Sequence, residues 1–187
     1  MAKHYNTVTP KVPKEVLIGF GVVLTVVLSL FLLTLRSNEQ RIYDIYEEVG
    51  AELSSDHPFY EVSFNGSLFN ESLESRINSG ELVILYIGSP QCPACVQTIG
   101  TVSDYFFSEG LDAFTPNIYY YEDFAGVAAS RDRNSFLEAY PDIVRSTPQV
   151  IAFLDGEIIA RYQAPTEGVT IERQVKNFFT TVLDLVN

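Results

Sequence analysis

Cysteine and histidine are scarce in this chain of 187 residues, and tryptophan is absent. The only cysteines are Cys92 and Cys95, and the two histidines, His4 and His57, lie far from them in the sequence. A structural zinc site needs about four ligands, so we expect no metal site. A purely structural disulfide would close a loop of only four residues and would stabilise the fold little. Metal binding and a structural disulfide stay open as the weaker alternatives to a chemical role for the pair.

Positive charge is scarce beyond residue 35. Residues 36–187 contain 9 Lys and Arg against 23 Asp and Glu, which gives a net charge of −14. Nucleic acids and anionic lipids are bound chiefly through Lys and Arg, so neither is an expected partner. The simpler role of this acidity is to keep an exported domain soluble. About 150 residues are enough for one domain with its own core.

Residues 16–35 form an uncharged, predominantly apolar run of 20 residues, which is long enough to cross a bilayer as one helix. The run exceeds the apolar part of a secretory signal, and no small-residue cleavage site follows it. We therefore expect an uncleaved transmembrane signal anchor, with a buried core helix as the alternative. Three lysines precede the run, whereas the arginines after it are mixed with acidic residues. The positive-inside rule then places residues 1–15 in the cytoplasm and the remainder outside the cell membrane.

Residues 36–58 are expected to form a helical stalk or linker. Ile42, Tyr46, Val49 and Leu53 recur at helical spacing, which predicts a short stalk or packing helix. The turn-forming residues 54–58 end it.

From residue 59 to residue 187 the pattern predicts an α/β domain. The continuous apolar run 82–87 is typical of a strand covered on both faces of a sheet. Asp155-Gly156, between strands expected at 150–154 and 157–162, indicates a tight hairpin. Further strands are expected at 59–63 and 117–121. Helices are expected around Phe69, Leu73 and Ile77, over 95–110, over 133–140 and over 171–185, which gives the order βαβαβαββα.

The motif Cys92-Pro93-Ala94-Cys95 lies between the strand expected at 82–87 and the helix that follows it. A thiol pair at this spacing can close a small disulfide and reopen it by exchange with the thiols of another protein. The motif therefore indicates redox chemistry.

A second segment strengthens this interpretation. Ser146-Thr147-Pro148-Gln149 leads into the strand and hairpin at Asp155-Gly156, about 55 residues after the cysteines. The two segments together resemble the thioredoxin superfamily over residues 59–187. The resemblance implies a thioredoxin-like fold, with a central mixed sheet flanked by helices, behind an N-terminal transmembrane helix. With the anchor included, the chain is similar to membrane-anchored thioredoxin-like proteins of Gram-positive bacteria, including the bacteriocin transport accessory type.

The position of the pair suggests a role for each thiol. If Cys92 caps the helix, the free N–H groups of the first turn and the helix dipole favour its thiolate. Pro93 suits the first helical position, where no N–H is needed. Cys92 is therefore the expected nucleophile, and Cys95, one turn later on the packing face, the resolving thiol. No cofactor is expected beyond a redox-active disulfide between them.

The resemblance also implies a substrate-binding element at Thr147 and Pro148. Pro148 would follow a cis peptide bond and lie against the cysteines, leaving the backbone of Thr147 free to pair with an extended substrate.

Three departures from the resemblance argue against a cytosolic thioredoxin role. Gln91 stands where many thioredoxins have tryptophan, and Tyr86 stands where they have a buried acid that relays protons. The dipeptide Pro93-Ala94 lacks the histidine of strong disulfide oxidases. We expect Tyr86 to be a core aromatic.

The sequence as a whole predicts a membrane-anchored, extracytoplasmic thiol–disulfide oxidoreductase that acts on cysteines of exported proteins or peptides. Its direction stays open, because an oxidant suits a compartment where disulfides persist and a reductant would draw electrons from a membrane redox partner. The alternative is a non-catalytic accessory module that binds peptides for export.

Overall fold

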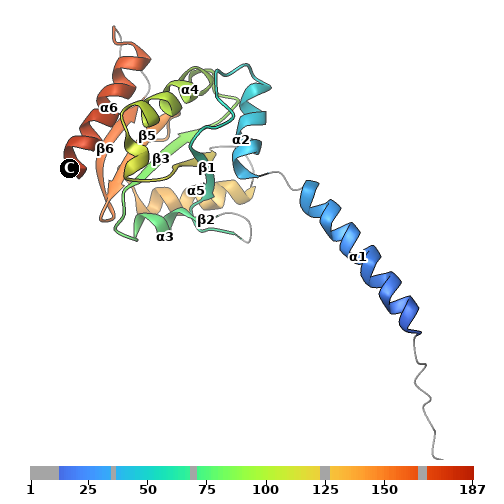
Figure 1. Ribbon diagram of the computed structural model, residues 1–187. Coiled ribbons are helices and arrows are strands. Elements are labelled where there is room, and N and C mark those ends of the chain that lie inside the picture. The colour runs from blue at the N-terminus through green and yellow to red at the C-terminus, as the bar shows by residue number, and fades with distance from the viewer. Residues whose placement is uncertain (1–12, 35–36, 68–70, 123–126, 164–167) are drawn as a thin grey trace, which may run out of the picture. The chain divides into compact units, whose positions relative to one another are not determined.

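The computed structural model describes residues 13–34, 37–67, 71–122, 127–163 and 168–187 (Figure 1). The chain divides into two compact units, Met1–Ser37 and Asn38–Asn187. The first unit contains helix α1 (Lys14–Thr34), along which large apolar side chains such as Phe20 and Val23 are exposed.

Within the described residues, which leave out the side chains of 30–36, no helix is long and apolar enough to cross a membrane. The expected span at 16–35 therefore stays a prediction. Residue 35 and the expected cytoplasmic segment up to residue 12 lie outside the described residues.

The second unit is a mixed β-sheet with helices on both faces (Figure 1). The strand order is β2-β1-β4-β3-β5-β6, in which the first four are parallel and β5 is antiparallel to both of its neighbours. This is the predicted central mixed sheet flanked by helices. Its elements are α2 (Asn38–Glu47), β1 (Phe59–Ser63), β2 (Glu71–Ser72), α3 (Leu73–Ile77), β3 (Val83–Gly88), α4 (Pro93–Ser108), the 3-10 helix η1 (Leu111–Ala113), β4 (Ile118–Glu122), α5 (Val127–Ala139), β5 (Gln149–Leu154), β6 (Glu157–Gln163) and α6 (Ile171–Val186).

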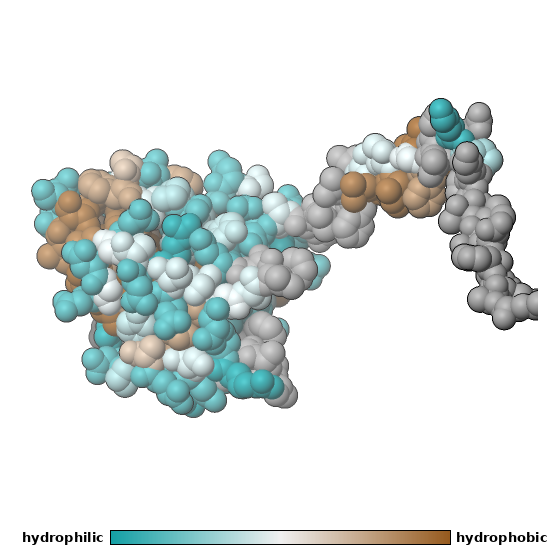
Figure 2. All heavy atoms as spheres, turned by 90° about the horizontal axis from the view of Figure 1, so that it is seen from below, coloured by the Kyte–Doolittle hydropathy of each residue, from teal (hydrophilic) through white to brown (hydrophobic). Residues whose placement is uncertain are grey.

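The sheet separates two apolar cores. One face packs against α2, α4 and α6, and the other packs against α3 and α5. Because successive side chains of a strand point to opposite faces, Tyr120 of β4 lies in the first core while its neighbours Tyr119 and Tyr121 lie in the second. The face of the molecule shown in Figure 2 is mainly hydrophilic over this unit, in keeping with its acidic composition.

The structure confirms most of the predicted elements. Strand β1 has the predicted bounds, and the hairpin turns at Asp155 and Gly156, whose φ angles of 52° and 81° suit a tight antiparallel connection. Helix α5 starts at Val127, earlier than the predicted residue 133. Strand β2 and helix η1 were not predicted, and Phe69, expected in a helix, lies outside the described residues.

Helix α2 packs on the domain. Of the two roles predicted for its segment, a short stalk or a packing helix, it therefore has the second. Ile42 and Tyr46 are fully buried in the first core. His57 is also buried: its Nε2 contacts the Glu39 carbonyl oxygen at 3.1 Å, and its Nδ1 accepts the N–H of Phe59. The predicted stalk region therefore contributes to the domain core from α2 onward.

Gly100, in the middle of α4, allows the segment after α2 to lie against that helix. A Cβ added at Gly100 would overlap the backbone carbonyl of Glu52. Alanine normally favours a helix over glycine by about 1 kcal/mol. At this position the overlap outweighs that gain, because backbone atoms cannot move aside as a flexible side chain can.

Substituting Gly100 by alanine should therefore lower the free energy of unfolding by about 1–3 kcal/mol, as overpacking does elsewhere. Denaturant unfolding of the full-length protein, followed by circular dichroism, measures this. Gln97→Ala, at an exposed position of the same helix, is the control and should change stability by less than about 0.5 kcal/mol. A Gly100→Ala protein as stable as its parent would contradict the described contact.

Candidate functional site

Cys92 occupies the N-cap of α4, immediately after the loop that follows β3. Its backbone is extended (φ −92°, ψ 111°), and its Sγ accepts a hydrogen bond from the N–H of Cys95 at 3.3 Å. Pro93 is the first residue of the helix. The loop before the cap is closed by the Cys92 N–H, which donates to the Ser89 carbonyl at 3.1 Å. The helix start thus presents the partly exposed Cys92 sulfur to solvent and to free N–H groups.

Cys95 lies one turn further along α4 and is fully buried. Of the two sulfurs, only that of Cys92 is therefore accessible to a macromolecular partner.

The pKa values of the two thiols are shifted in opposite directions. Burial raises the pKa of Cys92, but hydrogen bonds from the Cys95 and Thr147 side chains and from two backbone N–H groups outweigh burial and lower it overall. Burial, reinforced by the Cys92 side chain, raises the pKa of Cys95 to about 12. At neutral pH Cys92 is the better source of a thiolate, which is the reactive form of cysteine.

Thr147 is brought next to the cysteines although it lies 55 residues from Cys92 in the sequence. The Cys92 thiol is 3.7 Å from the Thr147 carbonyl oxygen. The Thr147–Pro148 peptide bond is cis, as the resemblance implies. The buried side chain of Gln149 holds this loop, because its Nε2 donates to the carbonyl oxygens of Val144 and Ser146.

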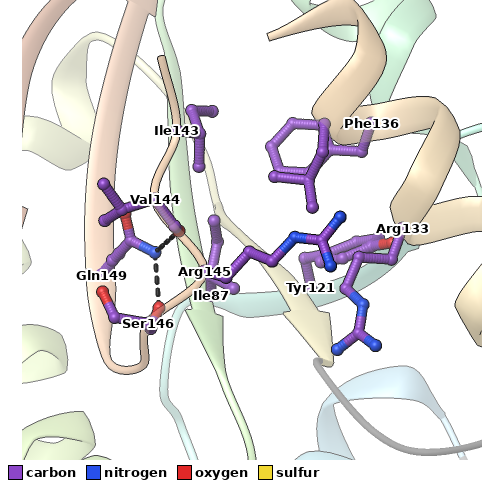
Figure 3. A pocket seen from close by; sticks show the side chains of 10 residues that line it. Ile87, Tyr121, Arg133, Phe136, Ile143, Val144, Arg145, Ser146 and Gln149 are labelled. Carbon is purple, nitrogen blue, oxygen red and sulfur yellow. Dashed lines mark hydrogen bonds between the residues drawn. The ribbon is translucent and has the colours of Figure 1, made fainter. Parts of the chain in front are cut away.

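A small pocket adjoins the same loop (Figure 3). Ile87, Phe136 and Ile143 line it, together with the two arginines Arg133 and Arg145. Its volume of about 20 Å³ is that of a water-sized group. A substrate side chain would not enter it.

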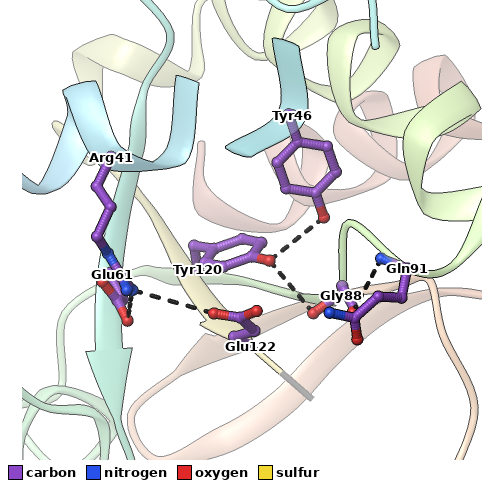
Figure 4. Close-up of polar contacts among 8 residues, drawn as sticks. Arg41, Tyr46, Glu61, Gly88, Gln91, Tyr120 and Glu122 are labelled. Carbon is purple, nitrogen blue, oxygen red and sulfur yellow. Dashed lines mark hydrogen bonds and ion pairs between the residues drawn. The ribbon is translucent and has the colours of Figure 1, made fainter. Parts of the chain in front are cut away.

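Sequence reasoning missed the aromatic side chains beneath the cysteines. Tyr86 is a fully buried core residue, as predicted, but its hydroxyl also donates to the Cys95 carbonyl oxygen at 3.2 Å. Tyr120 stacks beside it, and the Tyr46 hydroxyl lies 3.3 Å from that of Tyr120 (Figure 4). A pattern of apolar and aromatic residues cannot reveal where hydroxyl groups point. The alternation of β4 does indicate that Tyr120 shares a face of the sheet with the buried Ile118.

Charged side chains form a separate cluster near this site (Figure 4). Arg41 of α2 pairs with Glu61 of β1 and, at 4.0 Å, with Glu122 of β4. Burial raises the pKa of Glu122, with Arg41 acting against it. The ion pairs join α2 to strands β1 and β4.

The central mixed sheet flanked by helices, the cysteine pair at the start of the helix after β3 and the cis Thr147–Pro148 bond match the arrangement that the resemblance implies. The domain has a thioredoxin-like fold.

Solved structures resemble the thioredoxin-like domain. The J-Trx1 fragment of ERdj5 is 18% identical, with a TM-score of 0.44 over 71% of this chain, and this chain spans only 54% of that fragment. Thioredoxin from Trypanosoma brucei brucei is 10% identical, with a TM-score of 0.42 over 72% of this chain and 97% of its own. Plasmodium falciparum thioredoxin is 18% identical, with a TM-score of 0.36 over 57% and 86%. No protein-family model and no curated protein sequence matches the chain.

The difference in acidity predicts a selective reaction with iodoacetamide. Alkylation of Cys92 should rise with pH around a midpoint below the value of an ordinary thiol, because its pKa is lowered. Cys95 should stay unmodified in the folded thioredoxin-like domain through pH 9, three units below its pKa of about 12. Mass spectrometry after timed quenching measures both. Denatured protein, in which the two thiols should react alike, is the control; equal rates in the folded protein would refute the assignment.

Proposed function

We propose that this protein is a thiol–disulfide oxidoreductase, anchored in the cell membrane, that acts outside the cytoplasm on cysteines of exported proteins or peptides. The observation that carries the proposal is the asymmetry of the pair. Cys92 is partly exposed at a helix N-cap with a lowered pKa, whereas Cys95 is buried behind it with a raised pKa. An attacking thiol and a resolving thiol need this difference.

The reaction proceeds in two exchange steps. The Cys92 thiolate attacks a sulfur of the substrate disulfide, forms a mixed disulfide and releases the other substrate sulfur as a thiolate. Cys95 then loses its proton to solvent and attacks the Cys92 sulfur, which forms the Cys92–Cys95 disulfide and releases the second substrate sulfur as a thiolate that can take up a proton from solvent. Two electrons pass from the enzyme to the substrate. The reverse sequence oxidises a substrate dithiol and leaves the enzyme reduced.

The substrate lies along Thr147 in this proposal. The Thr147 carbonyl faces the Cys92 sulfur at 3.7 Å, so a backbone N–H of an extended substrate that binds there carries its own cysteine to the attacking atom. Main-chain pairing of this kind gives affinity without demanding a particular sequence. It suits an enzyme with several substrates.

The anchor in this proposal is the apolar segment 16–35. Its support is the absence of charge over 20 residues and the exposed apolar side chains of α1, including Phe20, Val23 and Val27. A stretch of exposed apolar surface on this scale requires a lipid or protein environment. The lysines before it favour a cytoplasmic N-terminus and an external domain.

The direction of electron flow follows the compartment. Outside the cytoplasm disulfides persist, so formation or repair of disulfides in exported proteins is the favoured role, and a reducing role requires a membrane redox partner. The similarity to membrane-anchored thioredoxin-like proteins of the bacteriocin transport accessory type supports exported peptides as substrates.

The experiment that tests this function is a redox titration of the full-length protein in detergent. The pair should cycle reversibly between dithiol and disulfide, and Cys92→Ala should abolish the transition. Two thiols that never form the intramolecular disulfide would refute the proposal.

A further inference from the structure

Two tyrosines lie stacked directly beneath the segment that carries the cysteines. Tyr86 of β3 and Tyr120 of β4 are paired in the sheet register, and their rings are 6.0 Å apart with an interplanar angle of 17°. Both are fully buried in the first core, on the same face of the sheet as α4. The two stacked rings therefore lie on the face of the sheet that packs against α4, the helix that begins at the cysteine pair.

The hydroxyl groups of Tyr86 and Tyr120 form hydrogen bonds with the two ends of the segment that carries the cysteines. The Tyr120 hydroxyl donates to the Gly88 carbonyl oxygen at 3.4 Å, and the Tyr86 hydroxyl donates to the Cys95 carbonyl oxygen at 3.2 Å. Gly88 ends β3, and Cys95 lies in the first turn of α4. Both sulfurs lie within the stretch of chain that these two hydrogen bonds delimit.

The surroundings keep the stack in place. A Cβ at Gly88 would overlap the Tyr86 ring, so the glycine leaves space for that ring. Phe59 packs edge-on against both tyrosines. The hydroxyl of Tyr46, from α2, lies 3.3 Å from that of Tyr120 (Figure 4). Because the Tyr120 hydrogen is directed to Gly88, Tyr46 is the donor in that pair.

Core packing alone does not account for these hydroxyl groups. Phenylalanine would fill the same space, whereas a hydroxyl group is buried without a large cost only where it has a hydrogen-bond partner, as both of these have. Burial raises the pKa of Tyr86 and of Tyr120 far above the usual range. Both phenols therefore stay protonated and serve as hydrogen-bond donors at every pH at which thiol exchange takes place.

We propose that Tyr86 and Tyr120 are positioning residues of the exchange reaction: they hold the segment that carries Cys92 and Cys95 by the carbonyl groups at its two ends. The inference rests on the proposed function. It assigns Tyr86 chiefly to the resolving step, because its bond fixes the residue whose sulfur must reach Cys92 in that step. Displacements of about 1 Å can slow such a step by up to about a hundredfold.

The test separates the two steps in the full-length protein. Cys92 is first converted to a mixed disulfide with glutathione at low pH. A jump to pH 8 then starts the attack of Cys95, which releases glutathione as a thiolate and is followed by quenched mass spectrometry. The first step is measured separately as the rate at which oxidised glutathione forms the mixed disulfide in a Cys95→Ala background. Tyr86→Phe should slow release roughly tenfold and leave the first step close to its parent rate.

Tyr121→Phe is the matched control. It removes a phenol hydrogen bond, 2.9 Å to Asp132, from the neighbouring strand β4 and on the opposite face of the sheet, and it should leave both steps unchanged. If Tyr86→Phe does not fold, Tyr120→Phe is measured in both assays: it removes the hydrogen bond at the Gly88 end of the segment and should slow the exchange, and parent-like rates in both steps would overturn the positioning role.

The outcomes distinguish a failure of this inference from a failure of the proposed function. Parent-like release in a folded Tyr86→Phe protein, with an active parent, overturns the positioning role and leaves the proposed function intact. Equal slowing of both steps, shared by Tyr121→Phe, indicates a general packing defect and also overturns it. A parent protein that never releases glutathione overturns the proposed function and the inference together.

Discussion

Covalent complexes with exported proteins should accumulate when Cys95 is replaced by alanine. The variant keeps Cys92, with its lowered pKa and its position at the helix N-cap, so the first attack still forms a mixed disulfide. The resolving thiol is then missing, and the complex is released only by external thiols. Non-reducing electrophoresis of cells quenched with acid should show these adducts, which should disappear on reduction.

Replacing Cys92 by alanine should abolish both the adducts and the catalysed exchange. The remaining thiol is fully buried, and burial, the largest cause of its raised pKa, persists in the variant and keeps it protonated at pH 7. The double alanine variant serves as the background. Adducts that form through Cys95 but not through Cys92 would reverse the assigned roles, and partner binding that survives in the double variant would favour a non-catalytic accessory module.

Cys92 should be labelled from outside intact, wall-free cells by a membrane-impermeant maleimide. The chain has only two cysteines and Cys95 is buried, so the reagent reports on one position.

Introducing aspartate at both Val23 and Val27 should release the protein from the membrane fraction, since each costs about 2.5–3.5 kcal/mol in the middle of a span. Val49→Asp, at an exposed position outside the run, should not.

Labelling only after the membrane is broken would place the domain in the cytoplasm, where lasting disulfides are rare. Protein that stays in the membrane fraction with both aspartates present would show that residues 16–35 are not the anchor.

The sequence predicts best those elements that depend only on residues close together in the chain. Strand β1 at 59–63 and the Asp155-Gly156 turn follow from residues that decide their own conformation. The start of α5 is different, because Val127-Ala128-Ala129 precede its amphipathic part and lack a polar face to mark them. Strand β2 has two residues, too few to show a period, and exists only by pairing with β1.

Long-range contacts account for most of what was missed. Val49 was placed on the same helical stripe as Ile42, but α2 ends at Glu47 and leaves Val49 exposed. In α6, which was predicted over 171–185, Leu185 is likewise exposed, whereas Phe179 is buried. In both cases tertiary packing, rather than periodicity, decides which side chains the core accepts.

The candidate site was predictable as far as its motif extends. Cys92 at the N-cap and Pro93 at the first helical position follow from rules about helix ends, and the structure has both. The link from Tyr46 to Tyr120 spans 74 residues and depends on how α2 docks. No pattern within either segment contains that information.

The redox titration of Cys92 and Cys95 in the full-length protein tests the central claim most directly. The protein is equilibrated in glutathione buffers of known potential, quenched with acid, and alkylated so that mass spectrometry separates dithiol from disulfide. The account predicts one reversible transition in which the ratio of disulfide to dithiol changes tenfold for every ~30 mV, as a two-electron couple requires. Thiols that remain reduced at every potential, or that form only separate glutathione adducts, would contradict it.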